Sequence, residues 1–156
     1  MSAKHMTWVM TMSAFAAGMI LANPARAGAQ VGTGLVDPNV AAEKALLALP
    51  HMTPARVTAL IAKRPFASVT DLNAFLLNQK LTEPQRKDFY AVAFVHVNLN
   101  TGTRDEILLI PGAGTRMAHE FVEYRPWRNW AQFEKEIGKY VGAAEAARLW
   151  RYVVIP

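Results

Sequence analysis

Apolar and polar positions in the last third of the chain recur with the period of short helices. A capping box at Thr103-x-x-Glu106 predicts the start of a helix over 103–110. Pro111-Gly112-Ala113-Gly114 then predicts a tight turn, because proline and glycine interrupt helices. A second helix is expected over 115–124, where apolar residues recur at i, i+4 and i+7. Two further helices are expected around a turn at 138–142, and no segment shows a convincing strand pattern.

The chain repeats itself with an offset of 61 residues and without a gap. The best-matched segments are Leu47–Pro50 with Leu108–Pro111, and Arg64–Phe66 with Arg125–Trp127. We call 36–95 the first repeat and 96–156 the second repeat, and we expect four short helices in each. Isolated helices of this length are only marginally stable, so the four must pack together. Phe66 and Trp127 are expected to fill the core of their repeats.

The first repeat carries helix-start signals of its own. Ser68-x-x-Asp71 and Thr82-x-x-Gln85 are capping boxes and predict two helix N-termini. The segment 28–35 that precedes this repeat is rich in glycine and is expected to be a flexible leader.

Residues 1–27 have the organisation of a secretory signal peptide. Lys4 precedes an apolar run over 6–21, and Ala25-Arg26-Ala27 forms a small-x-small cleavage site. A retained membrane anchor is the alternative, but these sixteen residues would fall short of the roughly 30 Å hydrocarbon core. We therefore expect secretion across the inner membrane to the periplasm. Removal of Lys4 and Arg26 leaves 15 basic and 12 acidic residues, a net charge of +3.

Composition narrows the class of protein. The 156 residues include no cysteine, and 52% of them are hydrophobic. These values exclude a disordered chain, a disulfide scaffold, a thiolate metal site and a cysteine nucleophile. His51, His96 and His119 lie far apart, without a carboxylate at a spacing typical of catalysis. We expect a protein that is not an enzyme and that has no cofactor, metal or small-molecule substrate.

The turn at 111–114 is the candidate binding site. A helix N-terminus presents unpaired N–H groups and the positive end of the helix dipole, which attract phosphate. Glycine lets the main chain approach an anion closely, although a tight turn between packed helices needs glycine in any case. The residues expected to contact phosphate here are Gly112, Ala113, Gly114, Thr115 and Arg116.

The segment 97–155 resembles the helix-hairpin-helix module of ComEA-type DNA-receptor proteins. The resemblance rests on Val97-Asn98-Leu99-Asn100-Thr101, Asp105-Glu106, Pro111-Gly112-Ala113-Gly114 and Glu123-Tyr124-Arg125. It implies an all-α fold of two tandem (helix-hairpin-helix)2 modules, the first diverged, which binds double-stranded DNA through its phosphates in DNA uptake. The resemblance adds a second phosphate contact in the other hairpin, where Gly142 is flanked by Lys139 and Arg148.

The fold is also similar to that of PsbU, an extrinsic subunit of photosystem II, and the first repeat looks more like this branch. That likeness implies a structural protein that docks onto a membrane-associated protein complex. Met117 stands where ComEA-type turns usually have a lysine, with Arg116 one place earlier. Duplex DNA and a membrane-associated complex are therefore the two candidate partners.

The two repeats are expected to differ at the turn. His51 and Thr53 replace the glycines in the first repeat, and Thr53 before Pro54 is a good N-cap. A hydroxyl that caps the helix would occupy the N–H groups that a phosphate needs, which predicts a weak anion site in the first repeat. In the second repeat, Trp130 is the best candidate for an exposed aromatic side chain.

Overall fold

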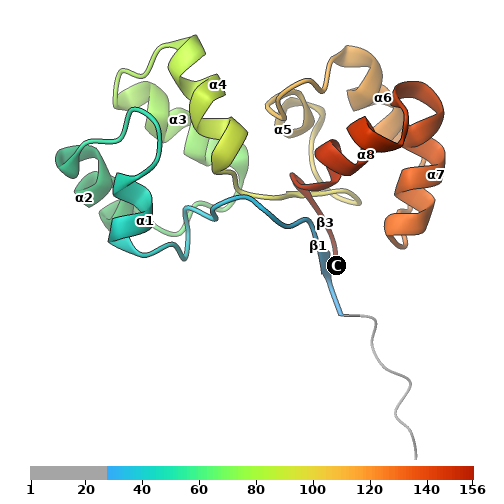
Figure 1. The fold of residues 1–156 in the computed structure, drawn as a ribbon, viewed down its shortest axis with the longest axis horizontal. Helices are drawn as coiled ribbons and strands as arrows, with labels where there is room; N and C mark the ends of the chain where they lie inside the picture. The colour runs from blue at the N-terminus through green and yellow to red at the C-terminus, as the bar shows by residue number, and fades with distance from the viewer. Residues whose placement is uncertain (1–27) are drawn as a thin grey trace, which may run out of the picture.

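The computed structural model describes residues 28–156, so the expected signal peptide at 1–27 lies outside the described residues. The described chain is mostly helical, with two groups of four helices side by side and a small sheet beneath them (Figure 1). The first group is α1 (Glu43–Leu47), α2 (Pro54–Lys63), α3 (Val69–Asn78) and α4 (Glu83–Val92), and the second is α5 (Arg104–Leu108), α6 (Thr115–Glu123), α7 (Trp130–Val141) and α8 (Ala143–Trp150). No helix within 28–156 is long and apolar enough to cross a membrane.

A three-stranded sheet joins the beginning, middle and end of the described chain. The strands are β1 (Gln30–Val31), β2 (Val97–Asn98) and β3 (Val153–Ile155). β3 lies in the centre, antiparallel to β1 and parallel to β2. The expectation of a chain without strands was therefore wrong. Strands of two or three residues are too short for an alternating pattern, and they form here by pairing segments far apart in sequence.

The segment 28–35 is docked against the second repeat, which corrects its expected flexibility. Gly32 N–H donates to the Val153 carbonyl over 3.0 Å, and the Gln30 side chain accepts from the Trp130 N–H over 2.8 Å. Arg151 donates to the Gly34 carbonyl over 2.6 Å. A Cβ at Gly32 would overlap the Trp150 carbonyl oxygen. Glycine here permits close main-chain approach rather than mobility.

Helix starts follow the sequence signals. Ser68 Oγ accepts from the Asp71 N–H over 3.2 Å, and Thr103 and Glu106 form the predicted capping box. The expected turn at 138–142 was too long, because α7 continues through Gly138 and ends at Val141. Gly138 lies between residues that pack into the core, and that packing outweighs the weak helix preference of glycine.

The offset of 61 residues is visible in the side-chain contacts. Asn39 accepts from the Phe66 N–H over 2.8 Å and donates to the Phe66 carbonyl over 3.1 Å. Asn100 makes the same two bonds with Trp127, over 2.6 and 2.9 Å. Phe66 and Trp127 are 3% and 2% exposed, which confirms that they fill the core.

One continuous apolar core runs through both repeats. At the junction, the ring of Phe94 contacts the ring of Tyr152 edge-on, with centroids 5.1 Å apart. The ring of Tyr90, on α4, contacts Phe94 in the same way at 5.5 Å. This aromatic chain places α4 of the first repeat beside the second repeat.

Candidate functional site

The turn between α5 and α6 is exposed but partly closed by its own hydrogen bonds. Gly112 has a φ of 81°, which favours glycine. Ala113 N–H donates to Ile110 over 3.0 Å, and Gly114 N–H donates to Gly112 over 3.1 Å. Ala113 is also buried. The amides of Ala113 and Gly114, which were expected to face an anion, are therefore used within the turn.

The first residues of α6 keep open donors. Gly114 is the N-cap and offers no side chain to the helix. In the described chain, no hydrogen bond uses the N–H groups of Thr115 and Arg116, which lie in the first turn, where a helix supplies no acceptor. Both residues are exposed, and a Cβ at Gly114 would meet nothing within 4 Å. The helix end is thus accessible and uncapped.

The corresponding turn of the first repeat is closed. Thr53 Oγ1 accepts from the Arg56 N–H over 3.3 Å at the start of α2, which confirms the predicted cap. His51 stands in place of Gly112, with a φ of 62°, and pairs with Asp88 over 2.8 Å. The repeats therefore differ in the chemistry of one turn.

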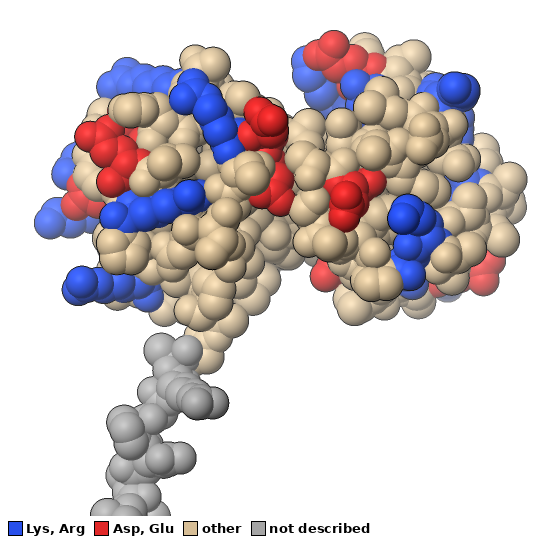
Figure 2. All heavy atoms as spheres, turned by 180° about the vertical axis from the view of Figure 1, so that it is seen from behind, with Lys and Arg blue, Asp and Glu red and all other residues tan. Residues whose placement is uncertain are grey.

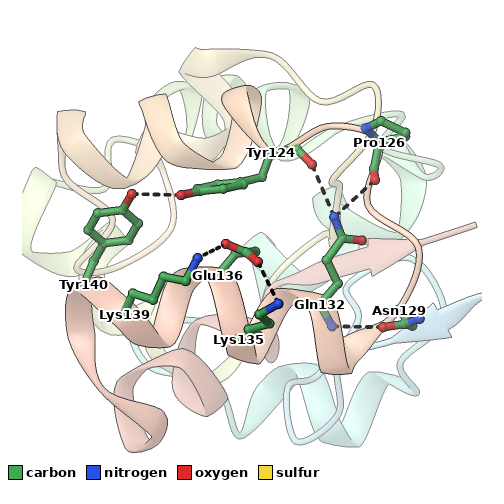
Figure 3. A network of polar contacts seen from close by, with 8 residues as sticks. All are labelled: Tyr124, Pro126, Asn129, Gln132, Lys135, Glu136, Lys139 and Tyr140. Carbon is green, nitrogen blue, oxygen red and sulfur yellow. Dashed lines mark hydrogen bonds and ion pairs between the residues drawn. The ribbon is translucent and has the colours of Figure 1, made fainter.

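Arg116 contacts Tyr140 of α7, which is hydrogen-bonded to Tyr124, the C-cap of α6. The guanidinium of Arg116 lies over the ring of Tyr140, 4.7 Å from its centroid. The hydroxyl groups of Tyr140 and Tyr124 are 2.9 Å apart (Figure 3). Hydrogen bonds with Tyr124 and with the buried Glu120 raise the pKa of Tyr140. The contact between the guanidinium and the ring face is a cation–π interaction, which favours this position of Arg116.

The other two expected cations are engaged with carboxylates. Lys139 is hydrogen-bonded to Glu136 (Figure 3), which raises the pKa of Lys139, and its amino group lies 5.7 Å from the centroid of the Tyr124 ring. Arg148 donates to the Pro111 carbonyl over 2.6 Å and to Glu145, whose hydrogen bond raises the pKa of Arg148. Arg148 therefore stabilises the turn through its hydrogen bond to Pro111.

The second hairpin turn is at Gly142, with a φ of 83°. A Cβ at this position would meet nothing within 4 Å. Gly142 precedes α8 and offers it no side-chain cap. Among the expected residues, the structure thus brings Arg148 against Gly112.

A cleft of about 490 Å³ lies between the two repeats and includes the turn. One wall is formed by α3 and α4 and the other by the end of α5 and the turn. Its polar lining includes Arg86 and Lys87 of α4, which the sequence analysis did not single out. No signal in the sequence marks them, because their position depends on how the repeats pack.

Charge on the face seen in Figure 2 is mixed. Basic and acidic side chains alternate over both lobes and form no single continuous basic patch on that face. An anion site on this face would therefore be local.

Several other candidates have structural roles. Trp130 is half-buried and packs on Phe133 and Trp150, so the expectation of an exposed ring was wrong. His119 pairs with Glu123 over 2.7 Å, one helical turn away, which corrects the expectation of histidines without carboxylate partners. Within 28–156, no three or more histidine, aspartate or glutamate residues gather as a metal site.

Comparisons of the chain with protein-family models, curated proteins and solved structures found no match.

Proposed function

We propose that this protein binds double-stranded DNA without sequence specificity, through phosphate groups at the start of α6. The single observation that carries the proposal is the uncapped helix end at Gly114, with exposed Thr115 and Arg116 following it. In this proposal the eight helices of the described chain form two tandem (helix-hairpin-helix)2 modules. The chain is exported to the periplasm and captures DNA for uptake, with no enzymatic step.

The physical basis is the electrostatics of one helix end. Free N–H groups and the helix dipole favour a phosphate, and the missing side chain at Gly114 lets it come close. Arg116 adds a positive charge that Tyr140 holds in place. Such contacts carry no sequence information. Because Lys139 and Arg148 are paired with carboxylates, they would add little to the phosphate contacts of this helix end.

The alternative function is docking onto a membrane-associated protein complex. It is favoured by apolar side chains exposed at equivalent positions of both repeats. The first repeat exposes Leu47 and Ile61, and the second exposes Leu108 and Val122. Paired cations such as Lys139 also weaken the electrostatic attraction for DNA.

Titration of a labelled duplex at several salt concentrations tests the proposal. We expect the logarithm of the affinity to fall linearly with the logarithm of salt concentration, by about 0.9 per phosphate contact. Gly114→Asp should abolish binding while the circular dichroism spectrum is unchanged, because a carboxylate would repel phosphate and cap α6. A dissociation constant weaker than about 100 μM at low salt would contradict DNA binding, since non-specific binders usually reach roughly 10⁻⁴–10⁻⁶ M.

A further inference from the structure

The cleft between the repeats places cations of one repeat opposite the turn of the other. We propose that Arg86 and Lys87 of the first repeat bind phosphates of the same duplex whose backbone rests on the start of α6. The inference rests on the proposed function and extends it, because DNA would then lie across both repeats. The observation behind it is that both residues line the cleft together with Gly112 and Gly114.

The two cations are available to an incoming anion. Arg86 is held by one hydrogen bond to the Leu81 carbonyl over 2.7 Å. In the part of the chain that the structure describes, no carboxylate lies within ion-pair distance of Arg86. Lys87 pairs with Glu83 over 2.7 Å, but both side chains are more than two-thirds exposed. An exposed pair of this kind contributes little and is easily exchanged for a phosphate.

The position of these cations is fixed by the core. Tyr90 is on the same helix as Arg86, one turn further along, and its hydroxyl donates to Asn73 over 2.9 Å. Its ring begins the edge-on aromatic contacts that continue through Phe94 to Tyr152 of the second repeat. α4 is therefore anchored against the second repeat. A ligand that spans the cleft would not have to order the two repeats first, which lowers the cost of binding.

The chemistry of the lining selects an anion. Its charged side chains are two cations and Glu83, the carboxylate already paired with Lys87. The opposite wall supplies glycine main chain and the apolar end of α5. The lining includes the turn as far as Gly114, the N-cap of α6, so a continuous chain of phosphates could follow the cleft onto α6. A duplex backbone fits this arrangement better than a free phosphate ion.

Neutralisation of each cation tests the inference in the full-length protein. Lys87→Gln should lower the magnitude of the salt slope by about 0.9, and Arg86→Gln with Lys87→Gln by about 1.8. Glu83→Gln should raise DNA affinity, because it removes the carboxylate that competes for Lys87. Lys44→Gln with Lys63→Gln is the matched control. These exposed lysines of the first repeat are not in the cleft lining, and the slope should stay unchanged.

The outcomes separate this inference from the proposed function. If the unaltered protein binds no duplex, the proposed function fails and the inference with it. If it binds and Gly114→Asp abolishes binding, but the cleft variants keep the full slope, the inference alone is overturned. An unchanged salt slope for Lys87→Gln alone is enough to overturn the inference, because Lys87 is exposed and this variant should fold normally. Equal binding of inorganic phosphate and duplex at matched phosphate concentration would also overturn it. So would a protein that binds an oligoglutamate peptide but no DNA, if the Arg86 and Lys87 variants lose that peptide binding.

Discussion

Thr53 and Gly114 are N-caps at equivalent positions, 61 residues apart, and only Thr53 closes the helix that follows it. The Thr53 hydroxyl accepts from the main chain of α2, whereas Gly114 leaves the start of α6 without a side-chain acceptor. A protein under pressure for stability alone would favour a capped helix at both positions. The open end of α6 is therefore a difference between the two repeats for which the proposed function supplies a reason.

Gly114→Ser should raise stability and lower DNA affinity together. A serine cap is worth a few tenths of a kcal/mol more than glycine, and a less flexible unfolded chain adds about 0.4–1 kcal/mol. The side chain has room, since a Cβ at Gly114 meets nothing within 4 Å. Urea denaturation and duplex titration measure the two effects.

The reciprocal variant is the control. Thr53→Gly should lower stability by about 0.5–1.5 kcal/mol, because the cap is lost and the unfolded chain becomes more flexible, and it should leave DNA affinity almost unchanged. His51 and its contact with Asp88 still occupy the turn of the first repeat in this variant. A change in DNA affinity for Thr53→Gly as large as that for Gly114→Ser would contradict the account.

Asn100→Ala should destabilise the protein by about 2–6 kcal/mol. The change removes both hydrogen bonds to the Trp127 main chain and leaves two polar groups unpaired, each at a cost of about 1–3 kcal/mol. Asn39→Ala in the first repeat should behave similarly, because Asn39 makes the equivalent bonds. Chemical denaturation measures the loss. Asn78→Ala, at an exposed position at the end of α3, should stay within about 0.5 kcal/mol.

Replacement by alanine should change the stability of the protein in opposite directions at Gly32 and Gly138. Gly32→Ala should cost about 1–3 kcal/mol, because the added methyl would collide with the Trp150 carbonyl and disturb the pairing of β1. Gly138→Ala should stabilise the protein by about 0.5–1 kcal/mol, since Gly138 lies inside α7 with open space around it. Thermal unfolding of both variants checks this. An unchanged midpoint for Gly32→Ala would mean that 28–35 is not docked.

Glu145→Gln should flatten the pH dependence of stability in acid. The hydrogen bond from Arg148 lowers the folded-state pKa of Glu145 below its ordinary value of 4.5. The pair therefore stabilises the fold above that value and loses its contribution as the pH falls through the folded-state pKa. The side chains are partly exposed, so the effect should be below about 1 kcal/mol.

Unfolding free energies between about pH 3 and pH 6 measure this slope. Glu134→Gln is the control, because Glu134 is exposed and forms no ion pair among the residues of the described chain. A slope that changes equally in both variants would contradict the assignment to Glu145.

Local signals predicted local structure well. The caps at Ser68, Thr53 and Thr103 lie within four residues of their partners, so a short stretch of sequence contains the whole interaction. Phe66 and Trp127 were identified because the repeat aligned them.

Long-range contacts were not predictable in this way. The hydrogen bond between Gln30 and Trp130 joins residues 100 positions apart, and no local sequence pattern predicts it. Arg86 and Lys87 look like ordinary surface cations of α4 until the packing of the two repeats brings them to the turn. The N–H of Gly114 was expected to be free, but it donates to the Gly112 carbonyl within the tight turn.

Main-chain amide shifts during a DNA titration test the central claim most directly. The 1H–15N spectrum of the protein is followed as a short duplex is added at low salt. The account predicts saturable shifts of the Thr115 and Arg116 amides. It predicts little change at Ala55, the counterpart of Arg116, and at Arg56, whose N–H is capped by Thr53 at the start of α2. Unchanged Thr115 and Arg116 signals at saturating duplex, or equal shifts at both helix ends, would contradict it.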